Sequence, residues 1–139
     1  MKIKSVMHNS VDWVDPSTPI GEIARLMRDH DIGAVPVGEN DRLVGMVTDR
    51  DLCCRGLANG GDVSKMTARD VMTAGIVYCR EGSDLSDAMR LMEEKKIRRL
   101  PVINDKKRMV GMLSLGDLSH AAPPEMSGEV MQAVSAHHA

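Results

Sequence analysis

Two segments of the chain carry apolar residues at the three- and four-residue spacing that predicts an amphipathic helix. The first segment has Ile20, Ile23, Ala24 and Met27, and the second has Leu85, Ala88, Met89 and Met92. A capping residue precedes each helix: Thr18, with Pro19 at the first helical position, and Ser83, followed by Asp84. Each helix is therefore expected to bury one face against a core.

Short apolar stretches around these helices predict strands, because polar turns bound them. They lie before each helix at 11–14 and 76–79, after it at 35–37 and 100–102, and beyond a polar turn at 43–47 and 109–113. A second helix is expected to begin near Asp49 and near Leu115. The order strand, helix, strand, strand, helix thus occurs twice, which predicts a mixed α/β (α+β) fold. Pro36 and Pro101 indicate edge or irregular strand positions, since proline has no N–H for the ladder.

The two halves also share residues, so the chain is a tandem repeat. A shift of 65 residues aligns Val6-Met7 with Val71-Met72, and a shift of 66 aligns Val44-Gly45-Met46 with Val110-Gly111-Met112. We predict a first repeat over 1–58, a linker over 59–66 around Asn59-Gly60-Gly61-Asp62, a second repeat over 67–122 and a C-terminal tail over 123–139. The tail has a possible short helix from Ser127 to Ala136.

Composition and charge narrow the class of protein. The 139 residues suit one compact body, and 18 basic against 20 acidic residues give a net charge of −2. This balance excludes the strongly basic surface of a general nucleic-acid binder. The chain has neither an apolar run of the roughly 18 residues that a membrane span needs nor the N-terminal apolar stretch of a signal peptide. We therefore expect a cytoplasmic protein whose cysteines, Cys53, Cys54 and Cys79, are reduced.

Trp13 and Tyr78 are the only aromatic residues, and the 65-residue shift relates them. Alternation along a strand would point each ring away from the side chain that precedes it. We interpret the two rings as packing residues. Two rings are also too few for the stacking platform of a single-strand nucleic-acid binder.

Each repeat closes with a buried strand, a hydroxyl residue and, three positions later, a carboxylate in the first turn of a helix. These residues are Thr48 and Asp51 in the first repeat and Ser114 and Asp117 in the second. A helix start offers free N–H groups and a positive dipole end to a phosphate, and a carboxylate accepts hydrogen bonds from ribose hydroxyls. The same pattern also caps a helix without any ligand, so the residues alone leave both readings open.

With both copies taken together, the sequence resembles a pair of cystathionine-beta-synthase (CBS) domains, the Bateman module, and in particular small stand-alone bacterial CBS-pair proteins. The resemblance rests on the Val-Met opening, on Ile97-Arg98-Arg99-Leu100-Pro101-Val102, and on the closing Gly-h-h-Ser/Thr-x-x-Asp pattern, where h is apolar. It implies two β-α-β-β-α repeats packed about a pseudo-twofold axis, and a homodimer. It also implies an adenosine-containing ligand in clefts between the repeats: AMP, ADP, ATP, NAD or S-adenosylmethionine.

The resemblance further implies the residues of two clefts. One cleft combines Thr48, Arg50 and Asp51 with Met72, Gly75, Ile76, Val77, Ile97, Arg98 and Arg99. The other combines Ser114, Gly116 and Asp117 with Ser10, Val11, Asp12, Ile32 and Gly33. Gly33 and Ala34 stand where the first cleft has its two pre-proline arginines. Because a charge-assisted hydrogen bond contributes about 1.5–3 kcal/mol, we expect tighter binding at Asp51, unless the arginines only form a solvated basic edge.

We hypothesise a regulatory module that is not an enzyme and that signals in trans to an unknown effector protein, with no nucleic-acid or membrane partner. The alternative is a stress-associated interaction or metal-binding protein that binds no nucleotide. The sequence has no Walker loop, Gly-x-Gly-x-x-Gly, His-Glu-x-x-His or nucleophile elbow. Asp29-His30-Asp31 is typical of a charged helix end. His8, His120, His137 and His138 match no standard metal-ligand spacing, so no metal site is predicted.

Overall fold

The contacts of the computed structural model, which describes residues 1–9, 12–40, 42–121 and 124–136, divide the chain into two compact units. Unit 1 comprises Met1–Val11 and Val77–Ala139, and unit 2 comprises Asp12–Ile76. These packing units differ from the sequence repeats, because the N-terminal segment of each repeat packs with the strands of the other repeat. Residues 59–66, the predicted linker, lie wholly within unit 2.

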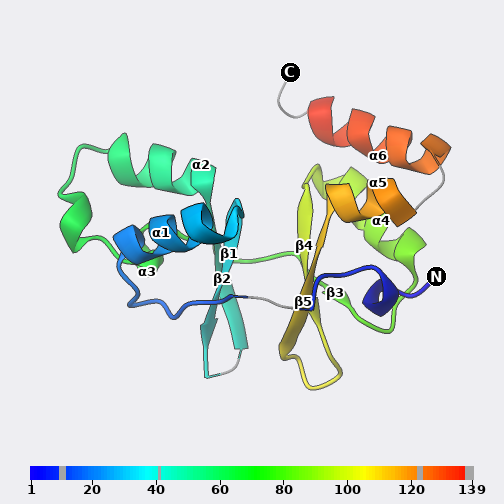
Figure 1. The fold of residues 1–139 in the computed structure, drawn as a ribbon, viewed down its shortest axis with the longest axis horizontal. Coiled ribbons are helices and arrows are strands. Elements are labelled where there is room, and N and C mark those ends of the chain that lie inside the picture. The colour runs from blue at the N-terminus through cyan, green and yellow to red at the C-terminus, as the bar shows by residue number, and fades with distance from the viewer. Residues whose placement is uncertain (10–11, 41, 122–123, 137–139) are drawn as a thin grey trace. The chain divides into compact units, whose positions relative to one another are not determined.

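Unit 2 packs short helices against a strand pair. Strand β1 (Ala34–Glu39) pairs in antiparallel fashion with β2 (Arg42–Thr48), with a register shift between Val37 and Gly38. The helical segments are α1 (Ile20–His30), α2 (Asp49–Asp51), the π-helical turn η2 (Leu52–Leu57), the 3-10 turn η3 (Val63–Lys65) and α3 (Ala68–Val71). Figure 1 shows the helices of this unit on one side of the strand pair.

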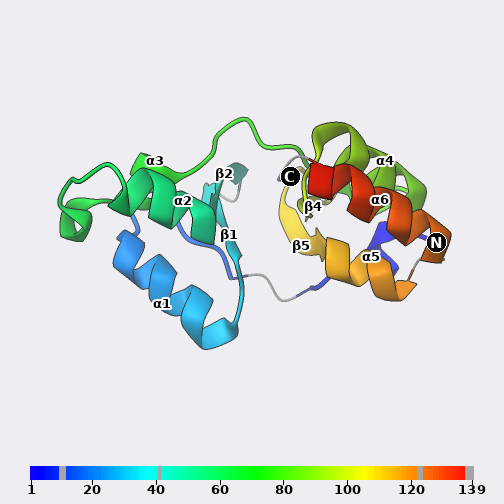
Figure 2. The same ribbon diagram turned by 90° about the horizontal axis from the view of Figure 1, so that it is seen from above.

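Unit 1 has the same plan with an additional strand and helix. Its segments are the 3-10 turn η1 (Ile3–Ser5), β3 (Cys79–Arg80), α4 (Leu85–Lys95), β4 (Arg99–Ile103), β5 (Met109–Ser114), α5 (Leu115–Ala121) and α6 (Pro124–Ala136). The sheet order is β3-β4-β5, in which β3 is parallel to β4 and β4 is antiparallel to β5. In Figure 2, α6 lies beside α4 and α5, the helices against which it packs.

The mixed helices and strands confirm the α+β prediction, but the predicted strands at 11–14 and 76–79 are wrong in extent. Only an isolated bridge at Val14 and the two residues of β3 form there, and Val11 lies outside the described residues. The chain passes from one unit to the other at 11–12 and at 76–77. Each predicted strand therefore begins in one unit and continues in the other.

Smaller differences concern the helix starts and the prolines. Helices α1 and α4 begin at Ile20 and Leu85, one residue later than predicted, with Pro19 and Asp84 at the N-cap. Pro36 lies in β1, which is an edge strand as predicted because its sheet has only two named strands. Pro101 lies in the middle strand β4, where β3 pairs only from Val102 onward. The missing N–H of Pro101 therefore interrupts no β3–β4 hydrogen bond.

Each unit has its own hydrophobic core, and the helical stripes face it. Three of the four predicted residues of α1 and all four of α4 are buried, while Ala24 is exposed. Met27, Met89 and Met92 are core residues. Helix α6 extends the predicted tail helix toward its N-terminus, and Val130 and Val134 complete the core of unit 1. Among the residues described, no helix has the length and apolar character to cross a membrane.

Neither aromatic residue belongs to a hydrophobic core, but the contact of the Trp13 ring with Gly38 agrees with the packing interpretation. The Trp13 ring lies against Gly38 and leaves no room for a Cβ there, but the residue is 40% exposed. Tyr78 is 44% exposed. Trp13 lies beside the 11–12 crossing and Tyr78 beside the 76–77 crossing, where the strand alternation assumed for them does not operate.

We expect Cys79 to resist thiol reagents in the folded protein, whereas Cys53 and Cys54 react. Cys79 is buried, and burial raises the pKa of its thiol to about 11; the other two are exposed. Alkylation followed by mass spectrometry should show two fast modifications and a third only after unfolding. Because folding raises this pKa, the buried neutral thiol contributes fully to the free energy of unfolding below about pH 9, and this contribution is lost as the pH rises toward 11. Rapid labelling of Cys79 in the folded protein would contradict this placement.

Candidate functional site

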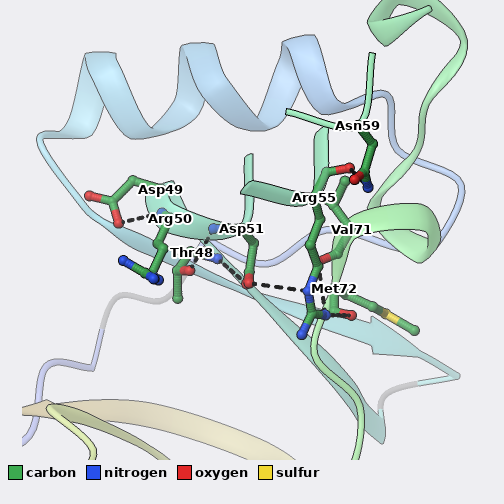
Figure 3. A network of polar contacts seen from close by, with 8 residues as sticks. All are labelled: Thr48, Asp49, Arg50, Asp51, Arg55, Asn59, Val71 and Met72. Carbon is green, nitrogen blue, oxygen red and sulfur yellow. Dashed lines mark hydrogen bonds and ion pairs between the residues drawn. The ribbon is translucent and has the colours of Figure 1, made fainter. Parts of the chain in front are cut away.

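The hydroxyl and the carboxylate that close the first repeat form a reciprocal cap at the start of α2. The Asp51 backbone N–H donates to Thr48 Oγ1 at 3.1 Å, and the Thr48 N–H donates to Asp51 Oδ2 at 2.9 Å. Figure 3 shows both side chains in this arrangement. The Asp51 side chain is 14% exposed, and the cap uses only one of its two carboxylate oxygens.

Arg55 faces the second oxygen of Asp51 (Figure 3). Its Nε lies 3.9 Å from Asp51 Oδ1, and its Nη1 donates to the carbonyl oxygens of Met72 at 2.9 Å and of Val71 at 3.5 Å. The guanidinium therefore connects the cap to the segment 71–72, which packs against β2. Arg55 was not among the site residues predicted from the sequence, although a spacing of four residues from Asp51 is a recognised signal for an ion pair.

The equivalent cap in unit 1 has nearly the same geometry. Ser114 N–H donates to Asp117 Oδ2 at 2.8 Å, and Asp117 N–H donates to Ser114 Oγ at 3.1 Å. The basic side chain that faces the other oxygen differs, because His8 Nε2 lies 2.8 Å from Asp117 Oδ1. His8 reaches this position because its backbone pairs with Met112 of β5. The sequence repeat gives no signal for this contact, since His8 aligns with a threonine.

Asp117 also borders a surface hollow in unit 1. The hollow has a volume of about 610 Å³ and is lined by Met1, Ser5, Val6, Asp117, His120 and Ala121. The Asp117 side chain is 12% exposed, so it is reached from this side without being freely solvated. The carboxylate thus combines a fixed position with access for a ligand.

A third cap of the same form lies at the start of α3. Thr67 N–H donates to Asp70 Oδ2 at 2.8 Å, and both reciprocal bonds are present. Asp70 is exposed, and no ligand site is predicted there. Reciprocal capping alone therefore does not distinguish a ligand site from an ordinary helix start. The facing basic side chain and the partial burial are what set Asp51 and Asp117 apart.

The other predicted site residues divide between the units. Unit 2 contains Thr48, Arg50 and Asp51 together with Met72, Gly75 and Ile76, and also Asp12, Ile32 and Gly33. Unit 1 contains Ser114, Gly116 and Asp117 together with Val77, Ile97, Arg98 and Arg99. Ser10 and Val11 lie outside the described residues. The structure thus brings Met72 to Asp51 within one unit, while grouping residues across units remains a prediction.

Individual positions add detail to this division. Gly75 has a backbone φ of +68°, a left-handed conformation that glycine adopts readily. The Asp12 carboxylate pairs with His30 at the end of α1. Arg50, Arg98, Arg99 and Gly116 are exposed, whereas Ile32 and Ile97 are half-buried against the cores of their own units.

Each pre-proline segment contacts the start of the closing helix of its own unit. The Asp49 N–H donates to the Gly33 carbonyl oxygen at 3.0 Å, and the Leu115 N–H donates to the Arg98 carbonyl oxygen at 2.8 Å. The backbone of Arg98 therefore lies beside the Ser114–Asp117 cap. The tighter binding expected at Asp51 from Arg98 and Arg99 requires a contribution from the other unit, and it stays a prediction.

Metal ligands do not gather in the part of the chain that the structure describes. No group of three or more His, Cys, Asp or Glu side chains is placed there to hold an ion. Asp29, which the sequence places with His30 and Asp31 at a helix end, pairs with Arg28. His137 and His138 lie outside the described residues.

Two similar α+β units, each with a capped, partly buried carboxylate, define a tandem α+β fold. The chain belongs to the CBS domain family, whose pattern matches residues 3–55 and 68–123. The resemblance to a pair of CBS domains that was predicted from the sequence is therefore confirmed. Hypoxic response protein 1 of Mycobacterium tuberculosis is 34% identical over 132 residues, which are 94% of this chain and 92% of that protein.

Two solved structures carry information about ligands of similar proteins. The crystal structure of Hypoxic Response Protein I with two coordinated zinc ions has a TM-score of 0.80 and 35% identity, covering 88% of this chain and 100% of that one. The crystal structure of CBSX2 in complex with AMP has a TM-score of 0.76 and 27% identity, covering 86% of this chain and 95% of that one. A similar CBS-pair protein thus binds an adenine nucleotide.

Proposed function

We propose that this chain is a regulatory CBS-pair protein that binds an adenosine-containing ligand such as AMP, ADP, ATP, NAD or S-adenosylmethionine, and that it is not an enzyme. The observation that carries the proposal is the duplicated carboxylate, Asp51 and Asp117, with one oxygen used in the cap and the other directed away from it. The AMP complex of a similar protein supports the choice of ligand class.

The chemistry of the two caps fits a ribose. In each unit the carboxylate is held in place by a backbone N–H at 2.8–2.9 Å, so a ligand does not have to order it. Its second oxygen, which lies outside the cap and faces Arg55 or His8, can accept hydrogen bonds from the ribose hydroxyls. The remaining residues of the two predicted clefts would contact the base and the phosphate, with Met72, Ile76 and Val77 as apolar members at Asp51 and Arg98 and Arg99 as its cations.

The signalling part of the proposal concerns partners. We propose that ligand binding between the repeats shifts their relative orientation and that this shift is read in trans by an effector protein. A homodimer in the cytoplasm is the expected assembly and location. Neither nucleic acid nor membrane is proposed as a partner.

We expect Asp51→Asn and Asp117→Asn each to remove AMP binding from one site. Asparagine still accepts the capping hydrogen bond, so the helix start is retained, but the charged acceptor for ribose is lost. Losing hydrogen bonds to a charged group weakens binding by about 1.5–3 kcal/mol, or about ten- to a hundred-fold. Isothermal titration with AMP should show half the stoichiometry in each single variant and no binding in the double variant.

Asp70→Asn is the matched control, because Asp70 sits in the same reciprocal cap but in no predicted site. It should leave AMP binding unchanged. The panel should also include ADP, ATP, NAD and S-adenosylmethionine, and Zn²⁺ for the metal-binding alternative, which rests on the zinc ions of a similar protein. AMP binding that survives the double substitution, or that falls equally in Asp70→Asn, would refute the ribose assignment.

A further inference from the structure

The two candidate carboxylates face different basic side chains, which come from different parts of the fold. Arg55, which follows α2, faces Asp51 Oδ1, and His8 of the N-terminal segment faces Asp117 Oδ1. The repeat alignment places Thr73 opposite His8 and Ala121 opposite Arg55. Each unit therefore has a basic side chain at its carboxylate, but it is arginine in unit 2 and histidine in unit 1.

The Arg55 and His8 side chains also differ in the contacts that fix their positions. Arg55 Nη1 donates to the Met72 and Val71 carbonyl oxygens, so the guanidinium is fixed from two sides. The His8 side chain is 71% exposed, and its imidazole contacts the Asp117 carboxylate. A ligand hydroxyl can therefore displace the imidazole from Asp117 Oδ1 into solvent without moving any buried group.

The charge of these two side chains responds differently to pH. Histidine changes charge between about pH 5 and 8, whereas arginine stays charged. An imidazolium holds a carboxylate through a charge-assisted hydrogen bond about twice as strong as a neutral one. A ligand that competes with His8 for Asp117 Oδ1 thus meets a stronger competitor at low pH.

We propose that His8 competes with the ligand for Asp117 and makes binding at this site weaken as the pH falls from about 8 to about 5.5, whereas Asp51 faces an arginine, a side-chain type that stays charged over this range. This inference rests on the proposed function, because it needs a ligand whose hydroxyls bind the carboxylate. Competition by His8 would make ligand binding at the Asp117 site sensitive to acidification. The two sites, which are otherwise similar because of the repeat, would then respond differently to pH.

The other charged groups around Asp117 are few in the described residues. His120 of α5 and Met1 line the same hollow, and the Met1 amino group pairs with Asp84 at 3.2 Å. Arg98 contributes its backbone carbonyl beside α5, and its side chain is exposed. His120 is thus the other histidine that the test has to separate from His8.

The test measures AMP binding by isothermal titration in the full chain carrying Asp51→Asn, so that only the Asp117 site contributes. His8→Gln is added and compared with its parent at the same pH, because the AMP phosphate itself titrates near pH 6. We expect His8→Gln to tighten AMP binding about five-fold at pH 5.5 and less than about two-fold at pH 8. His120→Gln should change neither value, and thermal melts should confirm that all variants are folded.

Each outcome decides between the possibilities. An effect of His8→Gln that is equal at both pH values, or tighter low-pH binding that requires His8, overturns the competition while leaving AMP binding intact. A pH-dependent effect carried by His120→Gln instead overturns the assignment to His8. Absence of AMP binding to the unsubstituted protein at every pH is a separate result, which overturns the proposed function and this inference with it.

Discussion

Val134→Asp is expected to unfold unit 1, with a loss of about 4 kcal/mol or more in the free energy of unfolding. Val134 of α6 is 0% exposed and packs in the core that also contains Met89, Met92 and Leu118. An aspartate there buries a carboxylate with no cationic partner in that cluster. Since a buried unpaired charge is among the most destabilising substitutions known, the helix cannot stay docked.

Urea unfolding followed by circular dichroism measures this loss, and Met131→Asp is the matched control. Met131 lies on the same helix and is also apolar, but it is 49% exposed. Its substitution should lower the free energy of unfolding by no more than about 1 kcal/mol. Equal unfolding of the two variants would mean that α6 is not part of the core of unit 1.

The size of the effect follows from what α6 contributes. Val130 and Val134 are both 0% exposed, and burying an aliphatic side chain of this size contributes roughly 1.5–3 kcal/mol. A domain is stable by only about 5–15 kcal/mol in total. The C-terminal helix, which has no counterpart in the first repeat, is therefore needed for the stability of unit 1.

The repeat and the helical faces were predictable from the sequence because they depend on spacing within one segment. The stripes of α1 and α4 and the caps at Thr48 and Ser114 are local, and local patterns survive folding. The contribution of α6 was not predictable, since its apolar positions show no partner until α4 and α5 are in place. The strands at 11–14 and 76–79 failed for the complementary reason: strand pairing depends on which segment lies beside them.

The residues of the candidate site differ in the same way, because some contacts join residues close in the sequence and others join residues far apart in it. The carboxylates Asp51 and Asp117 were found from their spacing to a hydroxyl residue, a relation within one turn of helix. Arg55 is four residues from Asp51, so its contact with Asp51 could also have been predicted from spacing. His8 lies 109 residues from Asp117 in the sequence, and only the pairing of the N-terminal segment with β5 brings the two together.

Gly111→Ala is expected to lower the free energy of unfolding by about 2–3 kcal/mol, because the N-terminal segment crosses β5 too closely for a side chain. A Cβ at Gly111 would lie 2.7 Å from the His8 carbonyl oxygen, and that carbonyl accepts a hydrogen bond from the Met112 N–H at 3.0 Å. The oxygen cannot withdraw without breaking this backbone pairing. The crossing segment must therefore shift as a whole.

Gly45→Ala in unit 2 is the matched control for this substitution. There a Cβ would meet only the Met72 side chain, whose sulfur lies 2.5 Å away, and no backbone atom is among its nearest neighbours. A methionine side chain can change rotamer to make room, so the expected loss is about 1 kcal/mol or less. Urea unfolding of both variants measures the difference.

Gly111→Ala is also expected to affect the candidate site, because the N-terminal segment that passes over Gly111 contains His8. Because His8 carries both the carbonyl at Gly111 and the imidazole at Asp117, Gly111→Ala should displace the imidazole and remove the pH-dependent component of AMP binding at Asp117. Gly45→Ala leaves His8 untouched and should preserve it. Equal stability losses in the two glycine variants would contradict the close backbone crossing, and a preserved pH dependence in Gly111→Ala would show that the imidazole keeps its place when the crossing is strained.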